Sequence, residues 1–273
     1  MKVTILVDNT TYRTNLLAED GFCAYIEDGD FKVLLDTGES DVFLRNAAQL
    51  KLDILQADYV VLSHGHHDHT WGLKYFIAQK QAQLGMKNSK LLMHPRALYR
   101  KTADLREIGF DLQWAELEIL EPQLSSKPVW LNERLLYLGQ IERLVEHEGK
   151  NTLGEEYLPD GTKQADYIYD DTAIAYKGEQ GLVIITGCSH SGIGNIIAQA
   201  KRLCQEERIQ AVIGGLHLRN PQPELLTATV EHLATQAIGD LVACHCTDQN
   251  SRIALAKLGN LVSPTVGLTL EYK

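Results

Sequence analysis

The hydrophobic residues of this chain gather in short runs, which are separated by turn residues such as Gly, Asp and Pro. Runs of this kind are typical of buried strands. We interpret as strands residues 3–7, 22–27, 31–35, 59–62, 91–95, 172–176, 182–186, 211–213 and 241–243. Apolar residues three and four positions apart predict helices around residues 43–50, 73–77, 196–203, 226–233 and 253–258. This alternation of strands and helices predicts an α/β fold.

The pattern loosens between residues 96 and 166, where turns interrupt the apolar runs. This stretch is too long for a simple connection in a compact domain. We therefore expect one domain, residues 1–273, with an insertion at about 96–166 that covers one side of a functional site. Within it, residues 135–143 predict a strand whose polar tip carries Arg143. Alternatively, the insertion lies at the periphery of the fold and does not contact the substrate.

A cluster of histidines follows the predicted strand 59–62. In extended backbone, side chains two positions apart point the same way, so His64 and His66 can bind one metal ion together. As the chain turns, Asp68 and His69 can face a second ion beside it. Imidazole and carboxylate groups are ligands for zinc, iron and manganese. The alternative, a solvated polar loop, explains neither the spacing nor the position after a strand.

Three further predicted strands are followed by histidines, namely His190, His217 and His245. Ligands of α/β proteins gather at the carboxyl ends of strands. A single histidine there is more often structural, but several that converge with residues 64–69 predict a metal centre. His94 either lines the same pocket or has a structural role.

Composition narrows the partners of the protein. The chain has 273 residues, a formal net charge of −10 and a pI near 5.5, which argue against a nucleic-acid-binding surface. No apolar run has the length of a membrane span, and the first apolar run is too short for a signal peptide. The five cysteines include no CxxC pair, which favours reduced thiols in the cytoplasm. We expect a small-molecule substrate, no nucleic-acid or membrane partner, and leave homo-oligomer formation open.

The run from His64 to His69, HGHHDH, resembles the HxHxDH signature of the metallo-β-lactamase superfamily. Residues 35–38, LDTG, resemble the first motif of the same superfamily. The resemblance implies an αββα sandwich, in which two mixed β-sheets flanked by helices pack face to face. It also implies metal ions at one edge, between the sheets.

Three shorter runs, residues 186–193, 213–218 and 245–247, resemble a narrower branch of that superfamily. The branch contains metal-dependent hydrolases and the archaeal dihydropterin ribofuranosyl-aminobenzene phosphate synthases. A synthase-like activity is therefore one of the functions that the resemblance implies.

The chain departs from the superfamily pattern in the third motif. No histidine occurs at about residues 168–171, and Gly187-Cys188 replaces the usual Gly-Asp pair. From the resemblance we infer that His190 completes the ligands of the first ion and His245 those of the second. Cys188 either ligates metal as a thiolate or packs beneath the site as a small buried residue. We favour packing, because a bridging thiolate is easily oxidised.

The resemblance implies two divalent metal ions, with zinc as the first expectation and manganese or iron as alternatives. A metal ion with an open position lowers the pKa of bound water, so that hydroxide can attack a carbonyl carbon or phosphorus. Asp68 would bind metal and orient this nucleophile, and Asp36 would support a ligand histidine or, alternatively, cap a turn. His217 is predicted as a catalytic residue or extra metal ligand. His217 and Arg143 are the predicted contacts for substrate anions, with a plain surface role as the alternative for Arg143.

Three functions are compatible with these residues. The first is a metal-dependent hydrolase that uses metal-bound hydroxide on a small anionic metabolite, such as an ester, lactone or phosphoester. The second is a pterin-related synthase that transfers a phosphoribosyl group. The third is a non-catalytic, metal-containing ligand-binding protein, which the missing third-motif histidine would explain.

Overall fold

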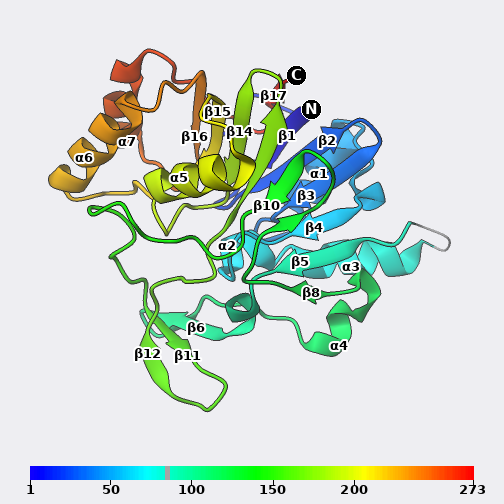
Figure 1. Ribbon diagram of the computed structural model, residues 1–273. Helices are drawn as coiled ribbons and strands as arrows, with labels where there is room; N and C mark the ends of the chain where they lie inside the picture. Colours follow the sequence, from blue (N-terminus) through cyan, green and yellow to red (C-terminus); the bar gives the residue numbers. More distant parts are fainter. Residues whose placement is uncertain (84–86) are drawn as a thin grey trace.

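The computed structural model describes residues 1–83 and 87–273, and most of its strands belong to two mixed sheets (Figure 1). The order of strands in the first sheet is β17 (Thr269–Glu271), β1 (Lys2–Val7), β2 (Cys23–Asp28), β3 (Phe31–Leu35), β4 (Tyr59–Val61), β5 (Lys90–Met93) and β8 (Gln123–Leu124). The order in the second sheet is β16 (Asp240–Cys244), β15 (Ile209–Gly215), β14 (Gly181–Thr186), β13 (Ala173–Gly178), β10 (Leu135–Tyr137) and β9 (Val129–Trp130). Each sheet contains a run of parallel strands: β3, β4, β5 and β8 in the first, and β14, β15 and β16 in the second.

The two sheets pack face to face, and the alternation of side chains along each strand divides their residues between three cores. Along β13, Ile174 and Tyr176 point between the sheets, whereas Ala173 and Ala175 point away from the first sheet. Two further cores therefore lie on the outer faces of the sheets, where helices cover them. Burial on both faces explains why the strands read as continuous apolar runs in the sequence.

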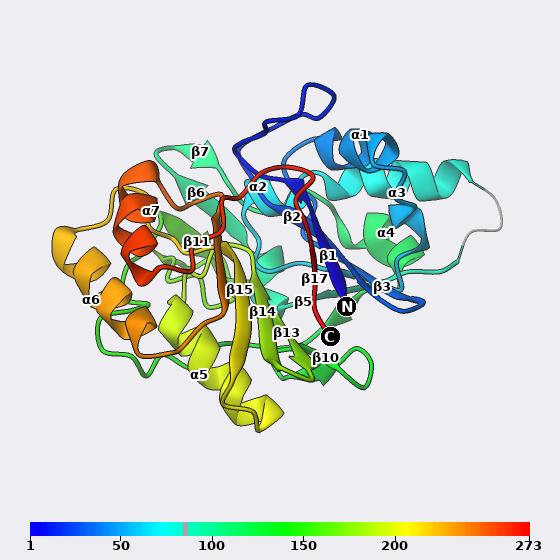
Figure 2. The same ribbon diagram turned by 90° about the horizontal axis from the view of Figure 1, so that it is seen from above.

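Helices cover both outer faces of the sandwich (Figure 2). The first sheet is covered by α1 (Val42–Gln49) and α3 (Leu73–Ala82), and the second by α5 (Ile193–Cys204), α6 (Pro223–Ala234) and α7 (Gln249–Leu255). The short helices are α2 (His67–Thr70), α4 (Trp114–Leu117), η1 (Ile54–Gln56), η2 (Pro95–Leu98), η3 (Glu118–Leu120) and η4 (Ala256–Leu258). This layer order is the predicted αββα sandwich. Within residues 1–83 and 87–273, no helix combines the length and apolar character needed to cross a membrane.

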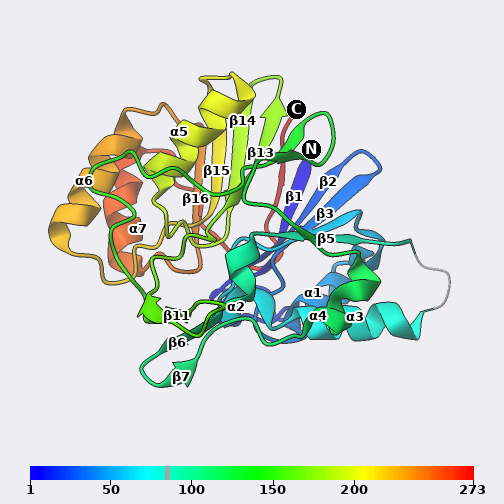
Figure 3. The same ribbon diagram turned by 60° about the horizontal axis from the view of Figure 1, so that its bottom comes forward.

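Residues 96–166 do not form the single insertion that the sequence predicts. Strand β8 pairs with β5, and β9 and β10 extend the second sheet, so these strands belong to the sandwich itself. A small third sheet stands apart, beside α2 (Figure 3), with the strand order β12 (Lys163–Ala165), β11 (Glu155–Tyr157), β6 (Arg100–Ala103) and β7 (Arg106–Glu107). The strand predicted for residues 135–143 ends at Tyr137, because the chain turns at Gly139 with a φ of +69°.

Candidate metal centre

Three imidazoles form the first cluster of ligand candidates. One ring nitrogen each of His64, His66 and His190 lie within 4.8 Å of one another, and all three residues are buried. The ring centroids are 4.5 to 5.0 Å apart, and the rings meet edge to face. None of the three Nε2 atoms has a hydrogen-bond partner among the described residues. Buried polar atoms are rarely left unpaired, so this convergence fits a site for a cation.

Asp68, His69 and His245 form the second cluster, and their ligand atoms also lie within 4.8 Å of one another. His245 Nε2 is 3.1 Å from Asp68 Oδ2, and His69 Nε2 is 3.7 Å from the same oxygen. The His64 and His69 rings have centroids 4.2 Å apart, so the two clusters are adjacent. The structure therefore brings together the residues that the sequence analysis assigned to two neighbouring ions.

The buried carboxylate of Asp36 orients two of these rings. His69 Nδ1 donates to Asp36 Oδ2 over 2.8 Å, and the Ser63 hydroxyl donates to the same oxygen over 2.7 Å. Because the Ser63 hydroxyl donates its only proton to Asp36, its oxygen accepts the hydrogen bond from His64 Nδ1, over 3.0 Å. Both rings then carry their proton on Nδ1, so Nε2 of His64 keeps a free lone pair. The bond from His69 Nδ1 to Asp36 likewise leaves Nε2 of His69 on the side of Asp68.

Asp36→Asn is expected to weaken metal binding roughly 10–100-fold, because the amide nitrogen cannot accept a hydrogen bond, so either the Ser63 backbone N–H or the pair His69 and Ser63 Oγ loses its acceptor. Competition with a chromophoric chelator measures this affinity. Asp111→Asn, which alters an exposed ion pair with Lys74, is the matched control. Unchanged affinity in Asp36→Asn would show that Asp36 only caps the turn.

Residues at the end of β1 position His245 from the opposite side. Asp8 Oδ1 accepts from the His245 backbone N–H at 2.7 Å, and Asn9 Oδ1 lies 2.8 Å from His245 Nδ1. The Gly21 backbone N–H donates to the same ring nitrogen over 3.1 Å, and these contacts hold the ring with Nε2 directed at Asp68 Oδ2. The sequence analysis did not assign a role to Asp8 or Asn9, although both follow an apolar strand just as Asp36 does.

Left-handed backbone turns the strand ends toward the site. The non-glycine residues with positive φ near the ends of β3, β14, β15 and β16 are Asp36 (58°), Ser189 (60°), His217 (51°) and His245 (41°). Such conformations cost of order 1–3 kcal/mol each and persist where surrounding contacts hold them. These four residues lie at the edge of the fold that carries the histidine clusters. Their backbone strain is therefore consistent with a site that holds its side chains in fixed positions.

The two clusters differ in their proton affinity. Burial lowers the pKa of His64 and His190 well below the usual value, and neighbouring imidazoles add to the effect. Burial likewise lowers the pKa of His66 to about 3. These three rings are neutral and suited to hold a cation. Burial alone would lower the pKa of His69 as well, but the carboxylates of Asp68 and Asp36 outweigh it and raise that pKa to about 9.

In the metal-free protein, protonated His69 is expected to stabilise the fold, and this contribution is expected to disappear as the pH rises. The folded pKa of about 9 lies above the usual 6.5, so this stabilisation is complete below pH 6.5 and is lost as the pH rises through about 9. We expect the Tm difference between the metal-free wild type and His69→Gln to narrow across this window. Calorimetry at several pH values measures it, and a constant difference would contradict the pairing of His69 with the two carboxylates.

Cys188 lies among the ligand candidates rather than beneath them. Its Sγ is 3.2 Å from His69 Nε2, and it shares one potential metal site with His64 and His69 and another with His245 and Cys246. Ligation and packing both stay predictions for this buried thiol. Topology explains its position, because Cys188 lies two residues beyond the end of β14 at the edge where the strand ends meet.

A cavity of about 410 Å³ opens onto both clusters. Segments of the third sheet supply apolar walls through Ala103, Ile108 and Leu153. His217 also lines the cavity, with its ring centroid 4.2 Å from that of His190, but it belongs to neither three-residue cluster. Its predicted roles in catalysis and substrate binding stay predictions.

The structure does not bring Arg143 to this cavity. Its guanidinium donates to the backbone oxygens of Gly149 and Ile168 and lies 4.8 Å from the Tyr169 ring, so it holds loops together. The cationic residue that does line the cavity is Arg219, which the sequence analysis missed. Arg219 follows His217 by two positions, and that spacing beyond a strand end was the signal available.

His94 has a structural role in this fold. Its Nδ1 accepts from the Arg96 backbone N–H at 3.1 Å at the start of η2, and its Nε2 is 3.3 Å from Gln140 Oε1. It does not line the cavity beside the clusters. A strand end alone therefore does not identify a ligand histidine.

A buried ion network contacts the histidine loop, residues 64–69. Lys101 Nζ lies 2.7 Å from Asp166 Oδ2 and 2.9 Å from Asp170 Oδ1, and all three side chains are fully buried. The other oxygen of Asp170 accepts from the Gly65 backbone N–H at 2.7 Å. The network thus ties the third sheet to the backbone between His64 and His66.

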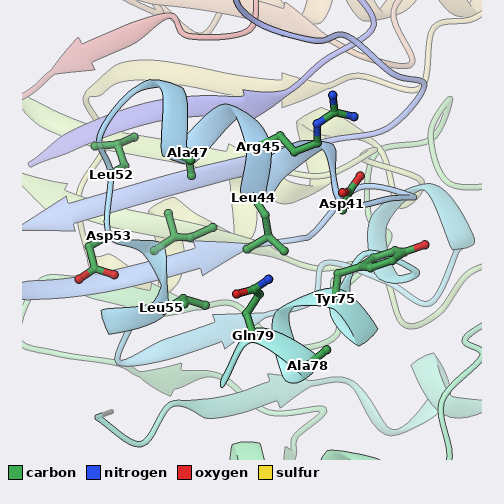
Figure 4. Close-up of a pocket in the computed structure, with 12 residues that line it drawn as sticks. Asp41, Leu44, Arg45, Ala47, Leu52, Asp53, Leu55, Tyr75, Ala78 and Gln79 are labelled. Atoms are coloured by element: carbon green, nitrogen blue, oxygen red, sulfur yellow. The ribbon is translucent and has the colours of Figure 1, made fainter. Parts of the chain in front are cut away.

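A second cavity of about 430 Å³ lies between α1 and α3 (Figure 4). Its walls come from both helices and from the loop that follows α1, with residues such as Leu44, Leu52 and Tyr75. No histidine or cysteine is among the described residues that line it. This cavity therefore offers no imidazole or thiol ligand among the described residues.

Comparisons with known proteins agree with this geometry. The family model described as the metallo-beta-lactamase superfamily matches residues 17–152. An uncharacterised protein of Methanocaldococcus jannaschii is 34% identical over 272 residues, which cover 97% of this chain and 98% of the relative. The 7,8-dihydropterin-6-methyl-4-(beta-D-ribofuranosyl)-aminobenzene-5'-phosphate synthase of the same organism is 28% identical over 89% of this chain and 86% of its own length. The crystal structure of Tm1679, described as a metal-dependent hydrolase of the beta-lactamase superfamily, superposes with a TM-score of 0.84 at 28% identity, covering 99% of this chain and 98% of that one.

Proposed function

We propose that this chain, which belongs to the metallo-β-lactamase superfamily, is a metal-dependent hydrolase of a small anionic metabolite. Esters, lactones and phosphoesters are the substrate classes that this chemistry serves. The observation that carries the proposal is the convergence of three buried, unpaired Nε2 atoms of His64, His66 and His190 beside a second cluster with a carboxylate.

The donor set fits divalent metal ions. His64, His66 and His190 would hold one ion, and Asp68, His69 and His245 a second, with nitrogen and oxygen donors that suit zinc, manganese or iron. When bound, such ions supply an activated water and polarise the oxygen of the group under attack. Burial lowers the pKa of His64, His66 and His190, so these rings are neutral and can each offer a nitrogen lone pair to an ion.

The chain's own residues then bind and orient the substrate. Asp68 belongs to a cluster and also lines the cavity, with a side chain that is 20% exposed. It can therefore orient an attacking water by accepting its hydrogen bond. Burial would raise the pKa of the Asp68 carboxyl, but His69 and His245 outweigh burial and hold that pKa well below its usual range, so the group stays ionised. Arg219 lines the cavity with its guanidinium paired to Asp20, and an anionic substrate group would bind there by sharing or displacing that carboxylate. Ala103 and Ile108 exclude water from the apolar side.

The hydrolase proposal is tested by removing and restoring metal. Protein stripped with a chelator and reloaded with zinc or manganese would be assayed on bis(p-nitrophenyl) phosphate, p-nitrophenyl acetate and a simple lactone. We expect hydrolysis of at least one compound by the loaded protein and none by the stripped protein or by loaded His66→Ala. Hydrolysis that is indifferent to metal removal would contradict the proposal.

The synthase is a second candidate, because the sequence match to the Methanocaldococcus jannaschii enzyme extends over most of both chains. A synthase that transfers a phosphoribosyl group to a pterin-related acceptor would use the same residues to bind an anionic donor. Consumption of a phosphoribosyl donor that requires the acceptor, without hydrolysis of the three test compounds, would favour it over the hydrolase.

A further inference from the structure

Two thiols and an imidazole form another group of donor atoms at the edge of the metal centre. The sulfurs of Cys188 and Cys246 and one ring nitrogen of His245 lie within 4.8 Å of one another, and all three residues are buried. The described residues contain no disulfide at these positions, so both thiols are free. Sulfur is a softer donor than nitrogen or carboxylate oxygen and selects different ions.

The backbone brings two neighbouring residues to the same place. Side chains that are adjacent in a strand point to opposite faces, which would separate His245 from Cys246. Strand β16 ends at Cys244, and His245 adopts a φ of +41°. This left-handed residue breaks the alternation, so that both side chains reach the site.

Neighbouring backbone groups fix the position of the Cys246 sulfur. The His217 backbone N–H donates to this sulfur over 3.2 Å, and His217 takes a φ of +51° to do so. At Gly215, a Cβ atom would stand 2.5 Å from the sulfur, so the glycine leaves room for it. When protonated, the thiol has an acceptor in the Cys188 carbonyl oxygen at 3.5 Å.

We propose that Cys188, His245 and Cys246 form a sulfur-containing site for a thiophilic divalent ion such as zinc or cobalt. Each thiol would release its proton to solvent as its sulfur–metal bond forms. The site shares His245 with the cluster of Asp68 and His69, so it deepens the proposed function by specifying how the second ion is held. Manganese, which prefers oxygen and nitrogen donors, would be held by Asp68 and His69 without the sulfurs.

Cobalt(II) tests the proposal because sulfur–cobalt bonds absorb strongly in the near ultraviolet. The stripped protein would be titrated with cobalt while absorbance and bound metal are measured together. We expect the band to appear in the wild type, to lose about half its intensity in Cys188→Ser and in Cys246→Ser, and to disappear in the double variant. Cys204→Ser, which changes a buried cysteine on α5, is the control and should keep the whole band.

The outcomes separate this proposal from the hydrolase. Cobalt bound by the wild type without a sulfur band would overturn the sulfur site and leave the histidine clusters standing. A band of undiminished intensity in Cys246→Ser would overturn the role of Cys246. Failure of the wild type to bind cobalt at all would overturn both proposals. Circular dichroism of each variant shows whether it is folded, and the wild-type result decides the matter even when a variant is not.

Discussion

His190→Ala is expected to lose about one equivalent of bound metal and to slow turnover at least a hundredfold, which is about 2.7 kcal/mol of transition-state stabilisation. His190 supplies one of three unpaired Nε2 atoms in the first cluster. Most catalytic zinc sites have three protein ligands, so a site left with His64 and His66 would bind weakly. Mass spectrometry of bound metal and assay of the best substrate measure the two effects.

His94→Ala is the matched control for this variant. His94 is also a buried histidine just beyond a strand, but its contacts are with Arg96 and Gln140 and not with the clusters. It should keep both metal equivalents, whatever it does to stability. Full metal content and unchanged metal affinity in His190→Ala would refute the ligand role of His190.

Lys101→Met is expected to lower the free energy of unfolding by about 3–5 kcal/mol, because its removal leaves two buried carboxylates without a cation. Asp166 and Asp170 would lose their only cation in the network, and both are fully buried. Denaturation with urea measures the loss. Lys163→Met, which removes an exposed ion pair with Glu155, is the control and should leave stability nearly unchanged.

The network also predicts how stability and metal binding are linked. Because Asp170 accepts from the Gly65 backbone N–H, loss of Lys101 should also loosen the loop that carries His64 and His66. Replacing both aspartates by asparagine in the Lys101→Met background should recover part of the stability, since no buried charge then remains. Stability of Lys101→Met equal to that of Lys163→Met would contradict the network.

The sequence predicts the parts of the centre that follow strand ends. The apolar run before His64 and the carboxylate after residues 31–35 place the histidine loop and Asp36 at the same edge of the fold. Parallel strands in each sheet make this inference possible, because their carboxyl ends lie together. The same reasoning brings His190 and His245 to the site.

The remaining contacts depend on partners that are far apart in the sequence. Lys101 and Asp170 are separated by 69 positions, and Asn9 and His245 by 236, so no local pattern announces either pair. The strands of residues 96–166 span only two to four residues, which is too short to show a period. Arg143 illustrates the limit: its predicted position at a strand end fails because β10 ends at Tyr137.

The metal content of the wild-type protein tests the central claim most directly. Protein incubated with zinc and freed of unbound metal would be analysed by mass spectrometry beside His66→Ala and His245→Ala, because His245 belongs to both groups of donors near the second ion. The two clusters predict about two equivalents per chain in the wild type, and about one in each variant, because each ion depends on its own three ligands. Less than half an equivalent in the wild type would contradict the account, as would two equivalents retained in both variants.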